Sequence, residues 1–210
     1  MEIRLLQGRF AAMGGVMLAP TRLLLGFVLL AVAARSQAAE LEILRVDFDL
    51  VEQEGARDPW YEIAVAVSVE EGDRGNGANP RFADEVAVSL ALATEVNRGG
   101  GRSFEFYAAR VEYPTLEVGQ HVVRFYLPPE IVKRDRVRGE PFGYEIEILS
   151  PAGLEDSLVS PNLERPEALQ SFRSEAASRS EESREMRLQF ETPFAWMYPR
   201  DTPSPRLKRP

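Results

Sequence analysis

The chain has 210 residues, of which 44% are hydrophobic and 28% are charged, with a formal net charge of −8 and no cysteine. This length allows one ordinary domain with an additional segment. The absence of cysteine excludes disulfides, thiol catalysis and a lipid anchor on a cysteine. The acidic balance makes nucleic acid and anionic membranes poor partners, because both attract clustered positive charge.

The first 38 residues have the pattern of a secretory signal peptide of the Gram-negative type. Three arginines precede the apolar run Leu23–Ala34, and Ser36 and Ala38 are small residues suited to cleavage before Ala39. The run is shorter than the ~20 apolar residues that a membrane-spanning helix needs. Four arginines and one glutamate lie in residues 1–38, so the rest carries 21 basic and 32 acidic residues, a net charge of −11. We therefore expect a periplasmic or secreted protein with no membrane span after cleavage.

From residue 41 the sequence alternates apolar and polar residues with a period of two, as strands with one buried face do. Three such segments come first, and their expected inward residues are Leu44, Val46, Phe48 and Leu50; Tyr61, Ile63, Val65, Val67 and Val69; and Val86, Val88, Leu90 and Leu92. The other face of the third segment carries only alanine and serine, which indicates either close cover by another element or a helix. Valine at every second position favours the strand.

Further strands are expected at 103–113, 121–128 and 141–150, with glycines 99–101 and a turn at 115–120 between them. The last of them places Tyr144, Ile146 and Ile148 on one face. About six strands separated by glycine- and proline-rich turns, with no helical period between them, predict an all-β fold. The expected architecture is an immunoglobulin-like antiparallel β-sandwich.

Two prolines interrupt the stretch RFYLPPEIVKRD between the last two strands. Proline cannot donate a hydrogen bond to a strand ladder but suits the first turn of a helix, so Pro128 should end a strand and Pro129 begin a helical turn. Glu130 then lies where the helix dipole favours an acid, and Ile131 and Val132 can cover the end of the sandwich. We expect this turn to carry the chain from one sheet to the other.

Beyond residue 151 the composition changes. Pro166, at the start, and Leu169 and Phe172, three residues apart, predict a helix whose second half is almost free of apolar residues. The expected organisation is a signal peptide at 1–38, the sandwich at 39–151, an irregular segment and helix at 152–189, and an aromatic, then basic and proline-rich, tail at 190–210.

Residues that carry chemistry are few. His121 is the only histidine, so neither a site with several imidazoles nor a Cys–His pair can form, and phosphate-binding and dinucleotide-binding motifs are missing. The acid pairs Asp47 with Asp49 and Glu145 with Glu147 should lie on solvent faces of strands. We expect neither enzymatic activity nor a cofactor.

The loop Glu70–Pro80 is a candidate calcium site because it carries several oxygen-bearing side chains. An EF-hand loop needs oxygen ligands where this loop has Gly75 and Gly77, so the match fails. An irregular calcium site at Glu70, Glu71 and Asp73 remains as the alternative to a plain loop at one end of the sandwich.

The tail contains the residues that we rank highest for function. These candidate partner-binding residues are Phe190, Phe194, Trp196, Met197 and Tyr198. Aromatic side chains beyond the sandwich must be buried against something. Either they dock back on the parent domain, or they enter a groove or an exposed sheet edge of another protein.

The signal peptide, the six-strand sandwich with FYLPPEIVKRD between its last two strands, and the aromatic tail together suggest a family. The chain resembles the small exported immunoglobulin-like proteins that some Gram-negative bacteria encode beside type IV pilus machinery. The resemblance covers Leu41 to about Ser150. It implies an accessory or scaffolding role in the cell envelope, with an envelope or pilus-associated protein as partner and no catalytic residues. The alternative is a carbohydrate-binding or adhesive module that uses loop aromatics.

Overall fold

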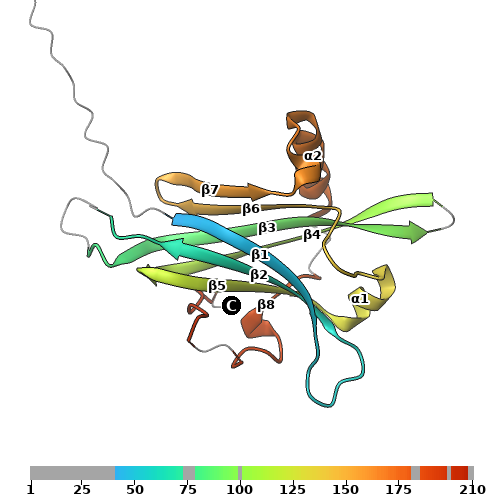
Figure 1. Ribbon diagram of the computed structural model, residues 1–210, viewed down its shortest axis with the longest axis horizontal. Helices are drawn as coiled ribbons and strands as arrows, with labels where there is room; N and C mark the ends of the chain where they lie inside the picture. Colours follow the sequence, from blue (N-terminus) through green and yellow to red (C-terminus); the bar gives the residue numbers. More distant parts are fainter. Residues whose placement is uncertain (1–40, 73–78, 99–100, 181–184, 198–199, 208–210) are drawn as a thin grey trace, which may run out of the picture. The chain divides into compact units, whose positions relative to one another are not determined.

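The computed structural model describes residues 41–72, 79–98, 101–180, 185–197 and 200–207 (Figure 1). The predicted signal peptide lies outside these residues. The long strands are β1 (Leu41–Val51), β2 (Trp60–Val69), β3 (Phe82–Arg98), β4 (Gly101–Glu117), β5 (Gly119–Leu127), β6 (Gly143–Ser150) and β7 (Gly153–Val159). The shorter elements are α1 (Pro129–Asp135), η1 (Pro161–Leu163), α2 (Pro166–Ser180), β8 (Arg187–Leu188) and η2 (Gln189–Glu191). None of the described helices is long and apolar enough to cross a membrane.

The strands form two antiparallel sheets with the orders β1-β2-β5-β8 and β4-β3-β6-β7. The expected all-β, immunoglobulin-like sandwich is confirmed. In a constant-type immunoglobulin domain the fourth strand belongs to the sheet of the first, second and fifth strands. Here β4 instead pairs with β3 along its whole length, in the opposite sheet. One side of the sandwich is therefore bordered by β5 and β4.

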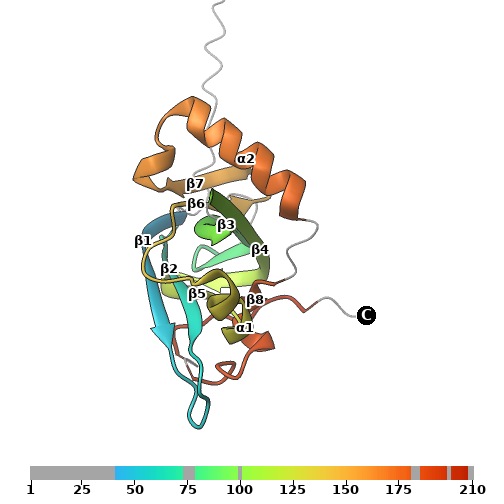
Figure 2. The ribbon, with the colours of Figure 1, turned by 90° about the vertical axis from the view of Figure 1, so that its right-hand side faces the viewer.

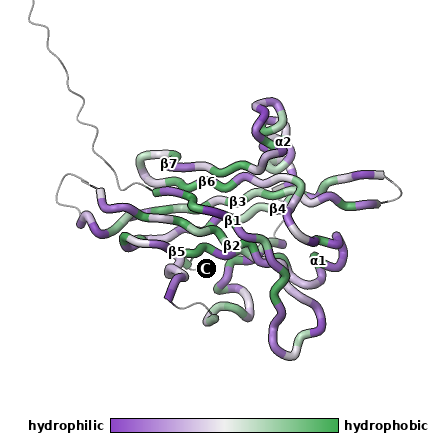
Figure 3. Tube along the Cα trace, in the orientation of Figure 1, coloured by the Kyte–Doolittle hydropathy of each residue, from purple (hydrophilic) through white to green (hydrophobic). Residues whose placement is uncertain are grey.

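The core lies between the two sheets and is built from the inward residues of the alternating segments. Every residue predicted to face inward on β2 and β3 is buried, and so are Tyr144, Ile146 and Ile148 on β6. Figure 3 shows this hydrophobic character along the strands, whereas α2 is largely hydrophilic. The predicted period of two was therefore a correct guide to the core of these strands.

The first strand departs from the predicted alternation. We expected Leu44 to face inward with Val46 and Phe48, but Leu44 is exposed and Ile43 is buried instead. The register against β2 shifts between Ile43 and Arg45, which marks a β-bulge. An extra residue in a bulge reverses the facing of the residues before it. Leu50, predicted inward, is also exposed near the end of this edge strand.

The predicted turn at 115–120 is largely strand. β4 continues to Glu117, where it still pairs with Phe82, and Leu116 is buried in the core. The chain changes sheets within one residue, Val118, before β5 begins at Gly119. Gly119 has a φ of 135°, a backbone conformation that side chains with a Cβ rarely adopt. The alternation of apolar and polar residues gave no sign of a change of sheet within a single residue.

The double proline produces the predicted change of sheet. Pro128 precedes α1, Pro129 occupies its first turn, and α1 connects β5 in one sheet with β6 in the other. Val132 is buried against the core. The helix ends at Arg136, whose left-handed conformation lets the Val137 N–H donate to the Val132 carbonyl at 3.0 Å.

The helix α2 covers the Ala93 end of the small-residue face of β3, where a small side chain leaves room for the helix. Phe172 and Ala176 of the helix form a buried cluster with Ala93 of β3 and Leu163, and Figure 2 shows α2 lying over this sheet. The expectation that Glu145 faces solvent was wrong. Glu145 is buried, and Arg173 of α2 donates to its carboxylate through Nε at 2.9 Å.

Replacing Phe172 tests this packing. The Phe172→Ala variant should lower the free energy of unfolding by about 3 kcal/mol, because it removes a buried ring that lies 5.7 Å from the ring of Phe106. Urea unfolding measures the change. Leu154→Ala is the control: this leucine of β7 is exposed, and its loss should cost less than about 0.5 kcal/mol. Equal, small effects of both changes would contradict the packing of α2.

Candidate partner-binding site

The C-terminal segment, residues 185–207, docks on the parent domain at its β5 side. Its first part forms β8, which extends the β1-β2-β5 sheet by two residues. In this ladder Leu188 lies opposite Phe125, and Arg187 lies opposite Tyr126. Figures 1 and 2 both show the C-terminal segment beside β5, on the side away from α2.

Two further backbone contacts tie the end of the segment to both sheets. The Val122 N–H on β5 donates to the Asp201 carbonyl at 2.8 Å, and the Arg206 N–H donates to the Glu112 carbonyl on β4 at 2.6 Å. Unpaired edge strands are templates for unwanted pairing with other chains. The segment therefore covers part of each sheet edge on this side of the sandwich.

Phe194 anchors the segment through its ring. It is 1% exposed and stacks on Tyr126, with ring centroids 5.0 Å apart and an interplanar angle of 14°. Trp60 meets the Phe194 ring edge-on at 5.9 Å. Aromatic pairs of this kind contribute roughly 0.5–1.5 kcal/mol beyond the burial of their surface. Phe194 is therefore part of the folded domain and is not available to a partner in this arrangement.

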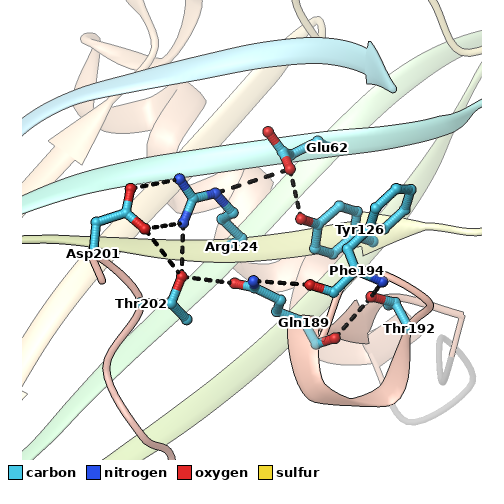
Figure 4. Close-up of polar contacts among 8 residues, drawn as sticks. All are labelled: Glu62, Arg124, Tyr126, Gln189, Thr192, Phe194, Asp201 and Thr202. Carbon is cyan, nitrogen blue, oxygen red and sulfur yellow. Dashed lines mark hydrogen bonds and ion pairs between the residues drawn. The ribbon is translucent and has the colours of Figure 1, made fainter. Parts of the chain in front are cut away.

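A buried arginine provides the polar half of the attachment. Arg124 of β5 donates to the Asp201 carboxylate at 3.0 and 3.3 Å and to the Thr202 hydroxyl at 2.8 Å. On its other side, Arg124 lies 3.9 Å from the carboxylate of Glu62 on β2. Figure 4 shows the guanidinium held between these groups. The planar fork of arginine suits such two-point binding of a carboxylate.

The hydrogen bonds continue from Thr202 into the turn around Phe194. The Thr202 hydroxyl donates to the Gln189 side-chain oxygen at 3.2 Å, and the Gln189 side-chain nitrogen donates to the Phe194 carbonyl at 3.2 Å. The Thr192 hydroxyl donates to the Gln189 carbonyl at 2.7 Å. Gln189 and Thr192 are both buried, so their polar atoms need these partners. The two ends of the segment are thus linked to each other as well as to the sheet.

The charge of Asp201 depends on Arg124. The hydrogen bond from the Arg124 guanidinium, more than any other cause, lowers the pKa of the Asp201 carboxyl below its ordinary value. The charged form of Asp201 is consequently the form that the folded segment requires.

The structure separates the five predicted partner-binding residues. Phe194 is buried, whereas Phe190, Met197 and Trp196 are 40%, 58% and 88% exposed; Tyr198 lies outside the described residues. In a turn where the Met197 N–H donates to the Phe194 carbonyl at 3.0 Å, Trp196 and Met197 are exposed two and three residues after the buried anchor. The prediction left open whether the tail docks on its own domain or on a partner. The described residues of the tail dock on their own domain, and their exposed apolar side chains form a surface that a partner can contact.

A groove of about 550 Å³ runs beside this exposed surface. We call it the C-terminal groove. Its apolar walls include Tyr113 of β4 and, from the C-terminal segment, Phe190, Trp196, Pro203, Pro205 and Leu207. Pockets of this size, with apolar walls and a few polar groups, are typical of binding sites.

The other candidates from the sequence have ordinary positions. His121 is half-buried at the start of β5, with Nε2 2.6 Å from the Glu117 carbonyl oxygen. In the loop Glu70–Pro80, the alternative calcium site, Glu70 and Glu71 are exposed and Asp73 lies outside the described residues. Within the described parts of the chain, no three histidine, aspartate or glutamate side chains are grouped closely enough to hold a metal ion.

Sequence reasoning missed the polar residues that hold the segment. Glu62 and Arg124 alternate with inward residues of β2 and β5, so their positions predicted only that they face away from the core. Nothing in the alternation showed that another segment covers them. The one available signal was Asp201, the single acid in the basic segment 200–210.

Comparisons with known proteins bear on the fold. No protein-family model and no curated protein matches the chain. A solved crystal structure from Akkermansia muciniphila is similar, with a TM-score of 0.65 and 16% sequence identity over 83% of this chain and 96% of that chain. At this identity the similarity shows the shared β-rich fold and no function.

The Asp201→Asn variant tests the ion pair without changing the shape of the side chain. We expect it to lower the free energy of unfolding by about 1 kcal/mol at pH 7, since the pair is partly exposed. Because the pKa of Asp201 is lowered in the folded protein, this contribution is present above the ordinary aspartate pKa of about 3.9 and is lost as the pH falls below it. Urea unfolding of both proteins between pH 2.5 and 7 measures the difference.

The matched control is Asp58→Asn. Asp58 is exposed and lies 3.9 Å from the Lys133 ammonium, so its loss should cost no more than about 0.5 kcal/mol at any pH. If Asp201→Asn differed from the original protein by the same amount at pH 2.5 and pH 7, the ionised carboxylate would not be what holds the segment.

Proposed function

We propose that the protein is a non-enzymatic, exported β-sandwich that serves as an accessory or scaffolding binder in the cell envelope, with an envelope or pilus-associated protein as its partner. In this proposal the exposed part of the C-terminal segment makes the contact. The sandwich holds that surface in place, and the predicted signal peptide delivers the protein to the periplasm or beyond.

One observation carries this proposal: Trp196 is 88% exposed although the turn that bears it is firmly attached to the domain. A tryptophan on a loosely held tail would lose much conformational freedom on binding. Here Phe194 is already buried two residues earlier, so the order that binding requires is largely present beforehand. Tryptophan is also among the residues most enriched in the energetic centres of protein interfaces.

The neighbouring side chains extend this apolar surface. Met197, Phe190 and Leu207 are 58%, 40% and 61% exposed, and Leu207 and Phe190 line the same groove as Trp196. Single exposed apolar residues are normal on soluble proteins, but a contiguous group often marks an interaction site. Methionine adapts its shape to irregular partner surfaces. The composition of this surface therefore favours a protein partner.

A carbohydrate-binding or adhesive module is the second candidate, and one aromatic pair favours it. Phe104 and Phe142 have ring centroids 4.5 Å apart, and Phe142 is partly exposed. The strand aromatics Tyr61 and Tyr107 are buried in the core and cannot extend this surface. This candidate thus has a smaller surface to work with than the C-terminal segment offers.

The partner proposal predicts the effect of removing the exposed side chains. A Trp196→Ala/Met197→Ala variant should recover its envelope partner at least tenfold less well than the original protein in affinity purification from native cell envelopes. Leu154→Ala removes a side chain of similar exposure from β7 and should leave recovery unchanged. Thermal unfolding should give equal stability for both variants, because the replaced side chains are exposed.

Equal recovery by all three proteins would remove the C-terminal surface from the proposed function. In that case a glycan array tests the carbohydrate candidate. Binding of a glycan by the original protein, with loss of that binding in the Phe142→Ala variant, would support the candidate.

Export has its own test. Expression of the full reading frame in a Gram-negative host should yield a periplasmic or secreted protein whose intact mass corresponds to a chain that begins at Ala39. Ala38→Arg places a large charge at the cleavage site and should leave the precursor uncleaved, whereas Ala39→Ser should be processed normally. An uncleaved original protein in the cytoplasm would contradict the proposed location.

A further inference from the structure

A small polar cleft lies between the end of β3 and the chain that connects α1 with β6. Its volume is about 200 Å³, and we call it the α1–β6 cleft. The polar and aromatic side chains of its lining are those of Thr94, Glu95, Arg136, Arg138, Glu140 and Phe142. None of its lining residues belongs to the C-terminal segment or lines the C-terminal groove, so the two sites are separate.

The charged side chains of the α1–β6 cleft balance one another. Arg136 and Arg138 supply hydrogen-bond donors, and Glu95 and Glu140 supply acceptors. The two arginines and Glu140 are exposed, and none of them forms an ion pair or a side-chain hydrogen bond with the described residues. Of the two Glu95 carboxylate oxygens, one accepts a hydrogen bond from Arg102 at 2.6 Å. This set suits a ligand without net charge that both donates and accepts hydrogen bonds.

An aromatic pair forms one wall of the cleft. Phe142 lines the cleft and is 39% exposed, and its ring centroid lies 4.5 Å from that of Phe104. A sugar ring has an apolar face of CH groups, which packs on an aromatic ring, and a rim of hydroxyls, which need hydrogen-bond partners. An aromatic wall beside free donors and acceptors offers both kinds of contact.

A buried hydroxyl in the lining also points to a ligand. Thr94 is 4% exposed, and its hydroxyl has no hydrogen-bond partner among the described residues. Buried polar groups are nearly always hydrogen-bonded, because burial without a partner costs stability. Thr94 belongs to the lining of the cleft, so a ligand hydroxyl seated against it would supply the missing hydrogen bond.

The connection between α1 and β6 is held in place by contacts that leave its charged side chains free. Val137 is buried in the core. The Tyr61 hydroxyl donates to the Gly139 carbonyl at 2.6 Å, and the Asn162 side-chain nitrogen donates to the Phe142 carbonyl at 2.7 Å. The backbone is thus fixed before a ligand arrives, which limits the ordering that binding requires.

We infer that the α1–β6 cleft binds one ring of a neutral saccharide, which stacks on Phe142 and exchanges hydrogen bonds with the free arginine and glutamate side chains. The cleft is smaller than the roughly 300–1,000 Å³ of pockets for drug-sized ligands, which limits the ligand to about one ring. The inference rests on the carbohydrate candidate for the function, whose site and ligand it names. It is independent of the contact proposed for the C-terminal segment.

Saturation-transfer difference NMR tests the inference, with the methyl glycosides of glucose, galactose, mannose and N-acetylglucosamine as probes. At least one of them should bind, and the strongest transfer should reach the protons on one face of the sugar ring, the face against Phe142. The uronic-acid and amino-sugar forms of the glycoside that binds are the matched charged probes. Both should bind about threefold more weakly or less, because each brings a charge next to a like charge of the lining.

Two variants with matched controls locate the binding. Arg138→Ala/Glu140→Ala should lose at least tenfold in affinity, whereas Glu164→Ala/Arg165→Ala, which removes an exposed acid and an exposed base elsewhere, should bind as the original protein does. Thr94→Val keeps the shape of the side chain and should also weaken binding. Its unfolding temperature should not fall, because the hydroxyl that it removes has no partner in the protein.

Three results would overturn the inference: no binding of any of the four glycosides, tighter binding of the uronic acid than of the neutral sugar, or unchanged binding by Arg138→Ala/Glu140→Ala. Tighter binding of the uronic acid would make the cleft an anion site instead.

The affinity purification described above separates this inference from the proposed partner contact. Trp196→Ala/Met197→Ala should bind the glycoside normally, and Arg138→Ala/Glu140→Ala should recover the envelope partner normally. Recovery that depends on Trp196, together with no glycoside binding, would reject the saccharide site alone. Glycoside binding without such recovery would support the saccharide site and reject the C-terminal contact.

Discussion

The open side of the sandwich, between β4 and β5, is the constraint on which the rest of the structure depends. On the opposite side the two sheets meet directly, because the Ile43 N–H of β1 donates to the Asp156 carboxylate of β7 at 2.7 Å. On the open side the outer face carries the apolar rings of Trp60 and Tyr126, whose burial is favourable, and the edge strands offer backbone groups with which other chains could pair. The C-terminal segment covers both, with Phe194 on the rings and its backbone on the edges.

This arrangement gives one segment two roles. Its buried residues complete the domain, and the residues between them are left exposed on a short, well-supported turn. A surface that must bind a partner is usually costly in stability, because it exposes apolar side chains. Here the same turn that exposes Trp196 is held by the Phe194 anchor and by hydrogen bonds through Gln189. The exposure of one side chain and the burial of its neighbour are therefore parts of one local structure.

Charge is distributed in a similar way. Acids such as Asp47 and Asp49 lie exposed on the strands, whereas Glu62 and Arg124 are buried where the C-terminal segment docks. Arg124 is central to both patterns, since it lies between Glu62 of the sheet and Asp201 of the segment. A buried arginine with carboxylates on two sides is stable only while both remain near it. Docking of the segment thus completes the electrostatic environment of the sheet as well as its apolar surface.

The sequence by itself determined that β1 to β6 are strands, which residues of β2, β3 and β6 form the core, and where proline directs the chain into the other sheet. These features depend on neighbours along the chain, because a strand repeats every two residues and proline acts on its own peptide bond. The bulge at Ile43, the cover of Glu145 by Arg173, and the division of the aromatic tail into a buried Phe194 and an exposed Trp196 were decided only by the tertiary structure. Each of them depends on a residue far away in the chain, and periodicity identifies the face of a strand but not what packs against it.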